Sequence, residues 1–175
     1  MLMCQPRSSA STTRCASNTL PMTTESNPST LLAISNPVPE RCVIVVDIHL
    51  PPGHAANAAA VLALTIGQRH PGLVGAPLID VNGQSMPGLI PIGISVLAAT
   101  QDELGALASA GDAGGFDVLR FPVEGQRTKN YTEFLAAVAQ MERAALRYVG
   151  VALVGDKKPI SKLVGKLALL GQEKQ

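Results

Sequence analysis

The sequence is poor in aromatic residues and nearly neutral, and each shortage weighs against a class of function. Aromatic residues make up 3% of the 175 residues and tryptophan is absent, so few side chains can stack on unpaired bases. Lysine and arginine total 14 against 13 acidic residues, which leaves a net charge of +1. No overall field therefore attracts nucleic acid or an anionic membrane surface, and composition alone predicts neither as a partner.

The sequence also lacks the marks of a membrane span, a metal site and the common cofactor sites. No apolar run approaches the ~20 residues that cross a bilayer. The three cysteines, Cys4, Cys15 and Cys42, follow no zinc-binding spacing. We interpret them as unpaired thiols in a reducing compartment, which predicts a cytoplasmic protein. Phosphate-loop and dinucleotide motifs are missing too, so we expect no metal and no cofactor.

The first forty residues differ in kind from the rest. Serine and threonine are frequent there, and Arg7 and Arg14 are the charged side chains before Glu25. This composition resembles an organelle transit peptide, but it also fits a disordered extension or an overlong start, with translation beginning at Met22. We favour the second interpretation. The predicted organisation is a disordered polar tail over residues 1–40 and one domain over residues 41–175.

The most informative stretch runs from Cys42 to Gly67. Its β-branched residues predict a buried strand, Cys42–Ile48, which carries Asp47 near its end. Two prolines and Gly53 then stop the extended backbone, and an alanine-rich helix is expected over residues 54–67. In α/β folds the carboxyl end of a strand and the start of the next helix border the crevice where ligands bind. This stretch therefore predicts the position of a site.

Strands and helices alternate along the rest of the chain, and this alternation predicts the fold class. A turn at Asn82-Gly83 follows a short edge strand, and Pro91 places the next strand at an edge or a bulge. Thr100 and Glu103 form a capping box. The expected fold is α/β, a three-layer α/β/α domain with a mixed sheet of four or five strands. Further strands are predicted over residues 89–97, 116–121 and 148–154, and helices over residues 100–111, 131–143 and about 157–165.

His54 and Asn57 are the candidate catalytic residues. His54 lies in the first turn of its helix, where the free amides and the helix dipole disfavour an imidazolium ion. It would therefore be a neutral base or a hydrogen-bond donor. Asn57 lies three residues later on the same face. The alternative is that His54 caps the helix and that Asn57 is a polar residue at its rim.

Two further polar groups provide candidate ligand-binding residues. One surrounds the start of the last helix, where basic side chains and unpaired amides suit a phosphate or a carboxylate, although a solvated helix face is the alternative. The other precedes the helix over residues 131–143. Together with the end of the first strand, the candidate set is Asp47, Gly53, Arg127, Thr128, Tyr131, Lys157, Lys158 and Lys162.

Four motifs of the chain resemble a known family. They are DIHLPPGHAANAAAVLALTIG, RHPGLVG, RTKNYTEF and VGVALVGDKKPISKLVGKLALL. Over about residues 41–170 the chain resembles the uncharacterised family catalogued as domain of unknown function 2000. That family is similar to peptidyl-tRNA hydrolase II, which implies a mixed four-stranded sheet flanked by helices and, by analogy, tRNA as a partner. His54 stands where those hydrolases carry a lysine, and Phe121 and Gly150 lie near the positions of their aspartate and threonine, so the resemblance implies fold more firmly than activity.

Three hypotheses of function follow. The leading one is that a small anionic or nucleotide-like ligand binds between the first helix and the last strand-helix turn, lined by His54, Asn57, Lys157 and Lys158. The second is a hydrolase or acyl-transfer enzyme in which His54 is the base and a lysine stabilises the oxyanion. The third is an interaction module that pairs as a homodimer through an apolar surface.

Overall fold

Burial of a β-branched run sets the position of the first strand, β1 (Arg41–Asp47). The computed structural model describes residues 38–172, so the predicted tail over residues 1–40 and the alternative start at Met22 lie outside the described residues, apart from residues 38–40. Each side chain from Cys42 to Val46 is at most 1% exposed. A strand that is buried on both faces lies inside a sheet between two layers, as the sequence predicts for this segment.

β1 lies in the middle of a mixed sheet that has five strands within the described range. The other strands are β4 (Ile94–Ala99), β5 (Asp117–Pro122), β6 (Tyr148–Gly155) and β7 (Ala168–Leu169). Their order is β5, β6, β1, β4, β7. β1 pairs in parallel with β4 and antiparallel with β6, so that Val45 lies opposite Leu97 on one side and Val151 on the other. The predicted mixed sheet is confirmed.

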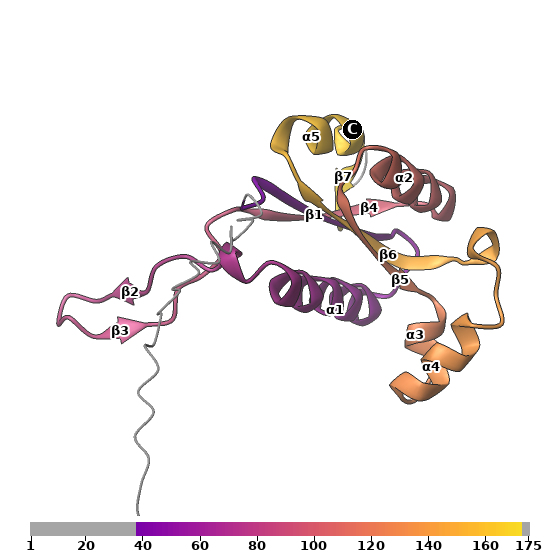
Figure 1. Ribbon diagram of the computed structural model, residues 1–175, viewed down its shortest axis with the longest axis horizontal. Helices are drawn as coiled ribbons and strands as arrows, with labels where there is room; N and C mark the ends of the chain where they lie inside the picture. Colours follow the sequence, from indigo (N-terminus) through magenta and orange to yellow (C-terminus); the bar gives the residue numbers. More distant parts are fainter. Residues whose placement is uncertain (1–37, 173–175) are drawn as a thin grey trace, which may run out of the picture. The chain divides into compact units, whose positions relative to one another are not determined.

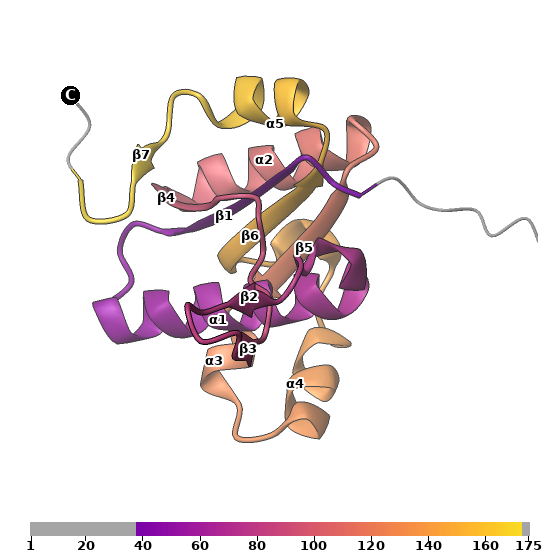
Figure 2. The same ribbon diagram turned by 90° about the vertical axis from the view of Figure 1, so that its left-hand side faces the viewer.

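Helices cover both faces of this sheet and make three layers (Figure 1, Figure 2). α1 (Pro52–Arg69) covers one face, whereas α2 (Gln101–Ala113) and α5 (Lys157–Val164) cover the other. Successive side chains of β1 point to opposite faces. Ile44 therefore lies in a core with α1, and Val45 lies in a second core with α2 and α5. The predicted α/β/α arrangement is confirmed.

The alanines of α1 let the helix approach the sheet closely. α1 begins at Pro52, two residues before the predicted start, because proline is well tolerated in the first turn. Ala55 and Ala58 are buried against the sheet. A Cβ added to Gly150 of β6 would lie 3.0 Å from Leu62 Cδ1, so larger side chains at this contact would push the two layers apart.

The segment between α1 and β4 forms a separate hairpin. After the short 3-10 helix η1 (Pro71–Leu73), β2 (Leu78–Ile79) pairs with β3 (Ser85–Met86). Figure 1 shows this hairpin standing away from the sheet. Gly83 in its turn has a φ of 76°, which glycine adopts without strain. The predicted turn at Asn82-Gly83 is therefore confirmed.

The prediction for the next strand, over residues 89–97, is wrong in its start and in its place. β4 begins at Ile94, and Pro91 precedes it. Proline has no N–H to donate to a ladder of hydrogen bonds, so pairing begins only after it. β4 then lies between β1 and β7 rather than at an edge.

The predicted caps of the later helices are present, although one helix is shorter than expected. Two short helices, α3 (Glu124–Arg127) and α4 (Tyr131–Val138), follow β5, and the 3-10 helix η2 (Arg143–Ala145) precedes β6. Asn130 Oδ1 accepts from Glu133 N at 2.9 Å, and Thr100 and Glu103 form the capping box of α2. The predicted end at Arg143 is wrong, because the chain leaves the helix in a turn in which Met141 N donates to Val138 O at 3.1 Å.

Ion pairs join the end of α1 to the start of β5. Arg69 donates two hydrogen bonds to the carboxylate of Asp117, each 2.8 Å long, and His70 Nε2 lies 2.8 Å from Asp117 Oδ2. The hydrogen bonds from Arg69 hold the pKa of Asp117 below its usual range, although partial burial opposes them. The carboxylate therefore stays ionised and fixes the end of α1 to the start of β5.

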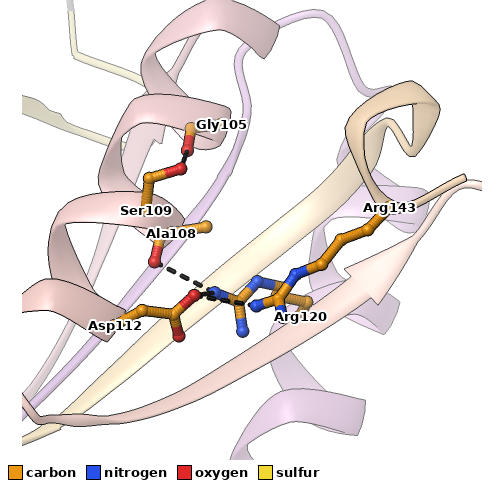
Figure 3. A network of polar contacts seen from close by, with 6 residues as sticks. All are labelled: Gly105, Ala108, Ser109, Asp112, Arg120 and Arg143. Carbon is orange, nitrogen blue, oxygen red and sulfur yellow. Dashed lines mark hydrogen bonds and ion pairs between the residues drawn. The ribbon is translucent and has the colours of Figure 1, made fainter.

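A second polar network ties α2 to β5 and to η2 (Figure 3). Arg120 of β5 donates to the carbonyl oxygen of Ala108 at 3.0 Å and also to Asp112 Oδ2. Arg143 of η2 donates to the same carboxylate oxygen at 2.8 Å. One carboxylate of α2 thereby holds the segment that leads into β6.

None of the helices in residues 38–172 is long and apolar enough to cross a lipid bilayer.

Two glycines of α2 provide a matched pair of variants. A Cβ added at Gly111 would lie 2.7 Å from both Leu153 Cδ2 and Val118 Cγ2, whereas one at Gly105 meets no atom within 4 Å. We expect Gly111→Ala to lower the free energy of unfolding by about 1–3 kcal/mol because it overpacks the core. Gly105→Ala should raise it by up to ~1 kcal/mol through helix propensity. Urea unfolding measures both, and equal effects of the two variants would contradict this packing.

Candidate functional site

The carboxyl end of β1 opens into a polar pocket. Asp47 ends the strand, the start of α1 forms one wall, and α3 and the segment leading into β6 form the others. The pocket has a volume of about 430 Å³, within the range of small-molecule sites. Its polar lining residues are Asp47, His54, Gln101, Glu124, Gln126, Arg127 and Arg147. The structure thus brings together three of the predicted residues, Asp47, His54 and Arg127.

Asp47 is held in place by the first residue of α2. Its Oδ2 accepts a hydrogen bond from Gln101 Nε2 at 2.6 Å, and its Oδ1 accepts from the backbone N–H of His49 at 3.0 Å. The Gln101 side chain also bonds both backbone polar groups of Tyr148, at 2.7 and 3.1 Å. Asp47 therefore helps to fix the floor of the pocket, with both of its oxygens already engaged.

Gln126 of α3 connects the two candidate catalytic residues. Its Nε2 donates to the backbone oxygen of His54 at 2.9 Å and to Asn57 Oδ1 at 3.2 Å, while its Oε1 lies 3.0 Å from His54 Nδ1. A backbone carbonyl can only accept, which fixes the orientation of the amide. Since Oε1 then faces Nδ1, that nitrogen carries the proton of the neutral ring. His54 Nε2 is left as a hydrogen-bond acceptor.

Two arginines line the polar pocket without partners. Neither the side chain of Arg127 in α3 nor that of Arg147 makes a hydrogen bond or an ion pair with other residues of the described range. Beside them, Glu124 Oε2 is buried and has no hydrogen-bond partner among those same residues. A buried acceptor without a donor costs free energy. The pocket thus presents two available guanidinium groups, and one carboxylate oxygen of a lining residue is buried without a donor.

Four other predicted residues lie at the rim of the pocket or next to it. Gly53 and Asn57 line a shallow depression beside His54. Thr128 and Tyr131 line a neighbouring cavity between α1 and α4. Thr128 Oγ1 donates to the backbone oxygen of Glu124 at 2.9 Å, and Tyr131 is 71% exposed.

The structure does not bring the first helix and the last strand-helix turn, predicted to enclose a ligand, together around one site. β6 runs antiparallel to β1, and Gly155 at its end pairs with Arg41 at the start of β1. Lys157 and Lys158 at the start of α5 therefore lie at the opposite end of the sheet from His54, and α5, with Lys162, covers the face opposite α1. The separation along β1 alone is about 20 Å, from six steps of ~3.3 Å. These lysines cannot share a small ligand with His54.

Sequence reasoning missed four residues of the polar pocket. Gln101 and Glu124 begin helices that follow strands, and this position could have marked them as candidates. Arg147 directly precedes the buried strand β6 and would have been found if that strand had been recognised as antiparallel. Gln126 carries no such signal, because an amide in a four-residue helix has no characteristic spacing.

Cys42 has no reactive role at this site. Its side chain is buried in β1, and burial raises the pKa of its thiol to about 11. The thiol therefore stays protonated near neutral pH.

Among residues 38–172, no group of three histidine, cysteine or acidic side chains lies close enough together to hold a metal ion.

The fold and the pocket define a three-layer α/β domain with a small polar cavity at the end of its central strand. The chain belongs to the family described as protein of unknown function (DUF2000), which matches residues 40–171. A solved structure described as the protein of unknown function Atu0240 from Agrobacterium tumefaciens strain C58 is similar in fold, with a TM-score of 0.66. Its sequence identity is 19%, over 74% of this chain and 96% of that one.

No curated protein is significantly similar to the chain in sequence. The further resemblance to peptidyl-tRNA hydrolase II stays a prediction.

The hydrogen bonds of Gln126 predict the tautomer of His54. In alkaline solution we expect the Nδ1–H tautomer to predominate, with Nε2 unprotonated, because Gln126 Oε1 can only accept. Nitrogen-15 NMR shifts of the imidazole distinguish the two tautomers. Gln126→Leu should return the ring to a mixture, whereas Asn57→Ala should leave it unchanged. A predominant Nε2–H form in the unaltered protein would contradict the arrangement.

Proposed function

We propose that the protein binds a small anionic ligand in the polar pocket. The observation that carries the proposal is the pair of guanidinium groups, Arg127 and Arg147, which line one cavity without partners in the described range. Arginine binds carboxylates and phosphates through two parallel hydrogen bonds. An anion in the pocket would give both side chains the partner that they lack.

The direction of the helices supports this proposal. α1 and α2 follow β1 and β4, which are parallel, so both helices begin at the Asp47 end of the sheet. The amino-terminal end of a helix favours negative charge by ~0.3–1 kcal/mol. The carboxylates of Asp47 and Glu124 oppose an anion, and hydrogen bonds from Gln101 and from the backbone of His49 stabilise the charge of Asp47.

The free ring nitrogen of His54 adds a second requirement. His54 Nε2 accepts a hydrogen bond, so a ligand that satisfies it carries a hydroxyl or amino group besides its anionic group. Hydroxy acids, amino acids and nucleotide-like molecules all meet this description. We therefore still propose an anionic or nucleotide-like ligand, but the arginines of this pocket bind it in place of the lysines of α5.

Binding of small anions tests the proposal directly. We expect a panel of inorganic phosphate, nucleotides, amino acids and hydroxy acids to contain a compound that raises the melting temperature. Arg127→Ala and Arg147→Ala should each weaken its binding at least tenfold, since a hydrogen bond to a charged group contributes ~1.5–3 kcal/mol. Lys158→Ala removes an exposed positive charge at the other end of the sheet and is the matched control.

Two results would count against the proposal. One is the absence of any stabilising compound in the panel. The other is a compound whose affinity, measured by calorimetry, falls with Lys158→Ala and not with the arginine variants.

A hydrolase or acyl-transfer activity is a second candidate, favoured by the free Nε2 of His54. In this alternative His54 would take a proton from an attacking water or alcohol, and an arginine rather than the predicted lysine would stabilise the oxyanion. Hydrolysis of simple acyl esters should then be lost in His54→Ala and unchanged in Lys158→Ala. Equal rates for the protein and for His54→Ala would rule out this role of the imidazole.

The remaining expectations stay predictions. They are a homodimer, a cytoplasmic location, a domain that begins near residue 41 after a dispensable tail, and no nucleic-acid partner beyond the analogy with tRNA. None of them is needed for the ligand proposed above.

A further inference from the structure

An apolar cavity lies next to the polar pocket, on the other side of the start of α1. We call it the apolar pocket, and its volume is about 790 Å³. It lies between the first half of α1 and the edge of the sheet formed by β4 and β7. Its lining is almost entirely apolar and includes Leu50, Ala56, Ala59, Val96, Ala98 and Leu170.

The apolar pocket exists because the side chains around it are small. α1 packs mainly on β1, β5 and β6, which leaves part of the β4–β7 edge uncovered on this face. Val96 and Ala98 pair with Ile44 and Val46 in parallel register, so they point to the same side as α1. Opposite them the helix carries Ala56 and Ala59. Leucine at these positions would fill the space. The alanines of α1 therefore not only allow close packing on the sheet but also leave this pocket open.

The two pockets share one lining residue. Leu50, in the loop between β1 and α1, lines both the polar and the apolar pocket. A ligand that crosses Leu50 would place one end beside Arg127 and Arg147 and the other against apolar side chains. Apolar surface left in water is unfavourable, and an alkyl chain covers it without needing hydrogen bonds.

We infer that the ligand is an amphiphile: a small acid whose anionic group lies in the polar pocket and whose alkyl chain occupies the apolar pocket. This inference rests on the proposed function for the head group and adds the class of the ligand. Linear carboxylates are the simplest molecules with both parts. The polar pocket alone would not distinguish them from short anions, whereas the apolar pocket would.

Calorimetry with a series of carboxylates tests the inference. Octanoate has four more methylene groups than butanoate, and each buried methylene contributes ~0.8 kcal/mol, or about fourfold in affinity. We therefore expect octanoate to bind about 200-fold more tightly than butanoate. Ala56→Leu should weaken octanoate at least tenfold and leave butanoate unchanged. Ala60→Leu, at an exposed position of the same helix that does not line the apolar pocket, should change neither.

Further variants and ligands distinguish the contribution of the alkyl chain to the affinity from that of the anionic group. Because Ala56 is exposed and leucine is a good helix former, its variant should fold normally, and Ala59→Leu repeats the test from a second position. Octanol should bind at least tenfold more weakly than octanoate, and Arg147→Ala should remove that difference. If octanoate binds no better than butanoate, the inference about the tail is wrong, although anion binding that depends on Arg147 would keep the proposed function.

Two outcomes would overturn the inference in other ways. If octanol and octanoate bind equally and the arginine variants have no effect, the head group does not lie in the polar pocket and the proposed function fails as well. If Ala56→Leu instead converts a dimer to a monomer in gel filtration and no carboxylate binds, the apolar pocket is a contact between copies of this chain.

Discussion

Burial of β1 on both faces is the constraint from which the other features follow. Five consecutive side chains, from Cys42 to Val46, lose almost all contact with water, so strands must flank them and helices must cover them from both sides. The neighbours differ in direction, because β4 is parallel to β1 and β6 is antiparallel. The two ends of the sheet are therefore unlike. α1, α2 and α3 begin at the Asp47 end, whereas α5 begins at the Arg41 end.

That asymmetry gathers the polar groups of the candidate site at one place. Gln101 holds Asp47 from α2, and Gln126 of α3 holds both His54 and Asn57 of α1. Both N–H groups of each amide donate to protein atoms, so these side chains fix geometry and offer no donor to a ligand. The groups that remain available are the two arginines and His54 Nε2. A rigid frame with a few free polar groups is the usual construction of a small-molecule site.

Local patterns in the sequence predicted much of the fold and part of the site. The apolar run of β1, the caps at Thr100 and Asn130 and the turn at Gly83 are each determined by a few neighbouring residues, and each is present. A cavity borders the end of β1, where the sequence predicted a ligand site, and the site itself stays a proposal. The direction of β6 has no local signature, since a strand buried on both faces has the same pattern in either direction. For that reason the lysines of α5 were assigned to the wrong end of the sheet and Arg147 was overlooked.

The network around Asp112 has a consequence for solutions of different ionic strength. Arg143, whose side chain is 70% exposed, ties η2 to this carboxylate, and four residues further along the same segment Arg147 enters the polar pocket. Salt screens exposed ion pairs, with a Debye length of about 8 Å at physiological strength and about 3 Å at 1 M. Concentrated salt would therefore act on an anion twice, by weakening its direct attraction to Arg147 and by loosening the tether that positions that arginine. The affinity for an anion should therefore fall more steeply with the concentration of potassium chloride than screening of the direct attraction alone would give.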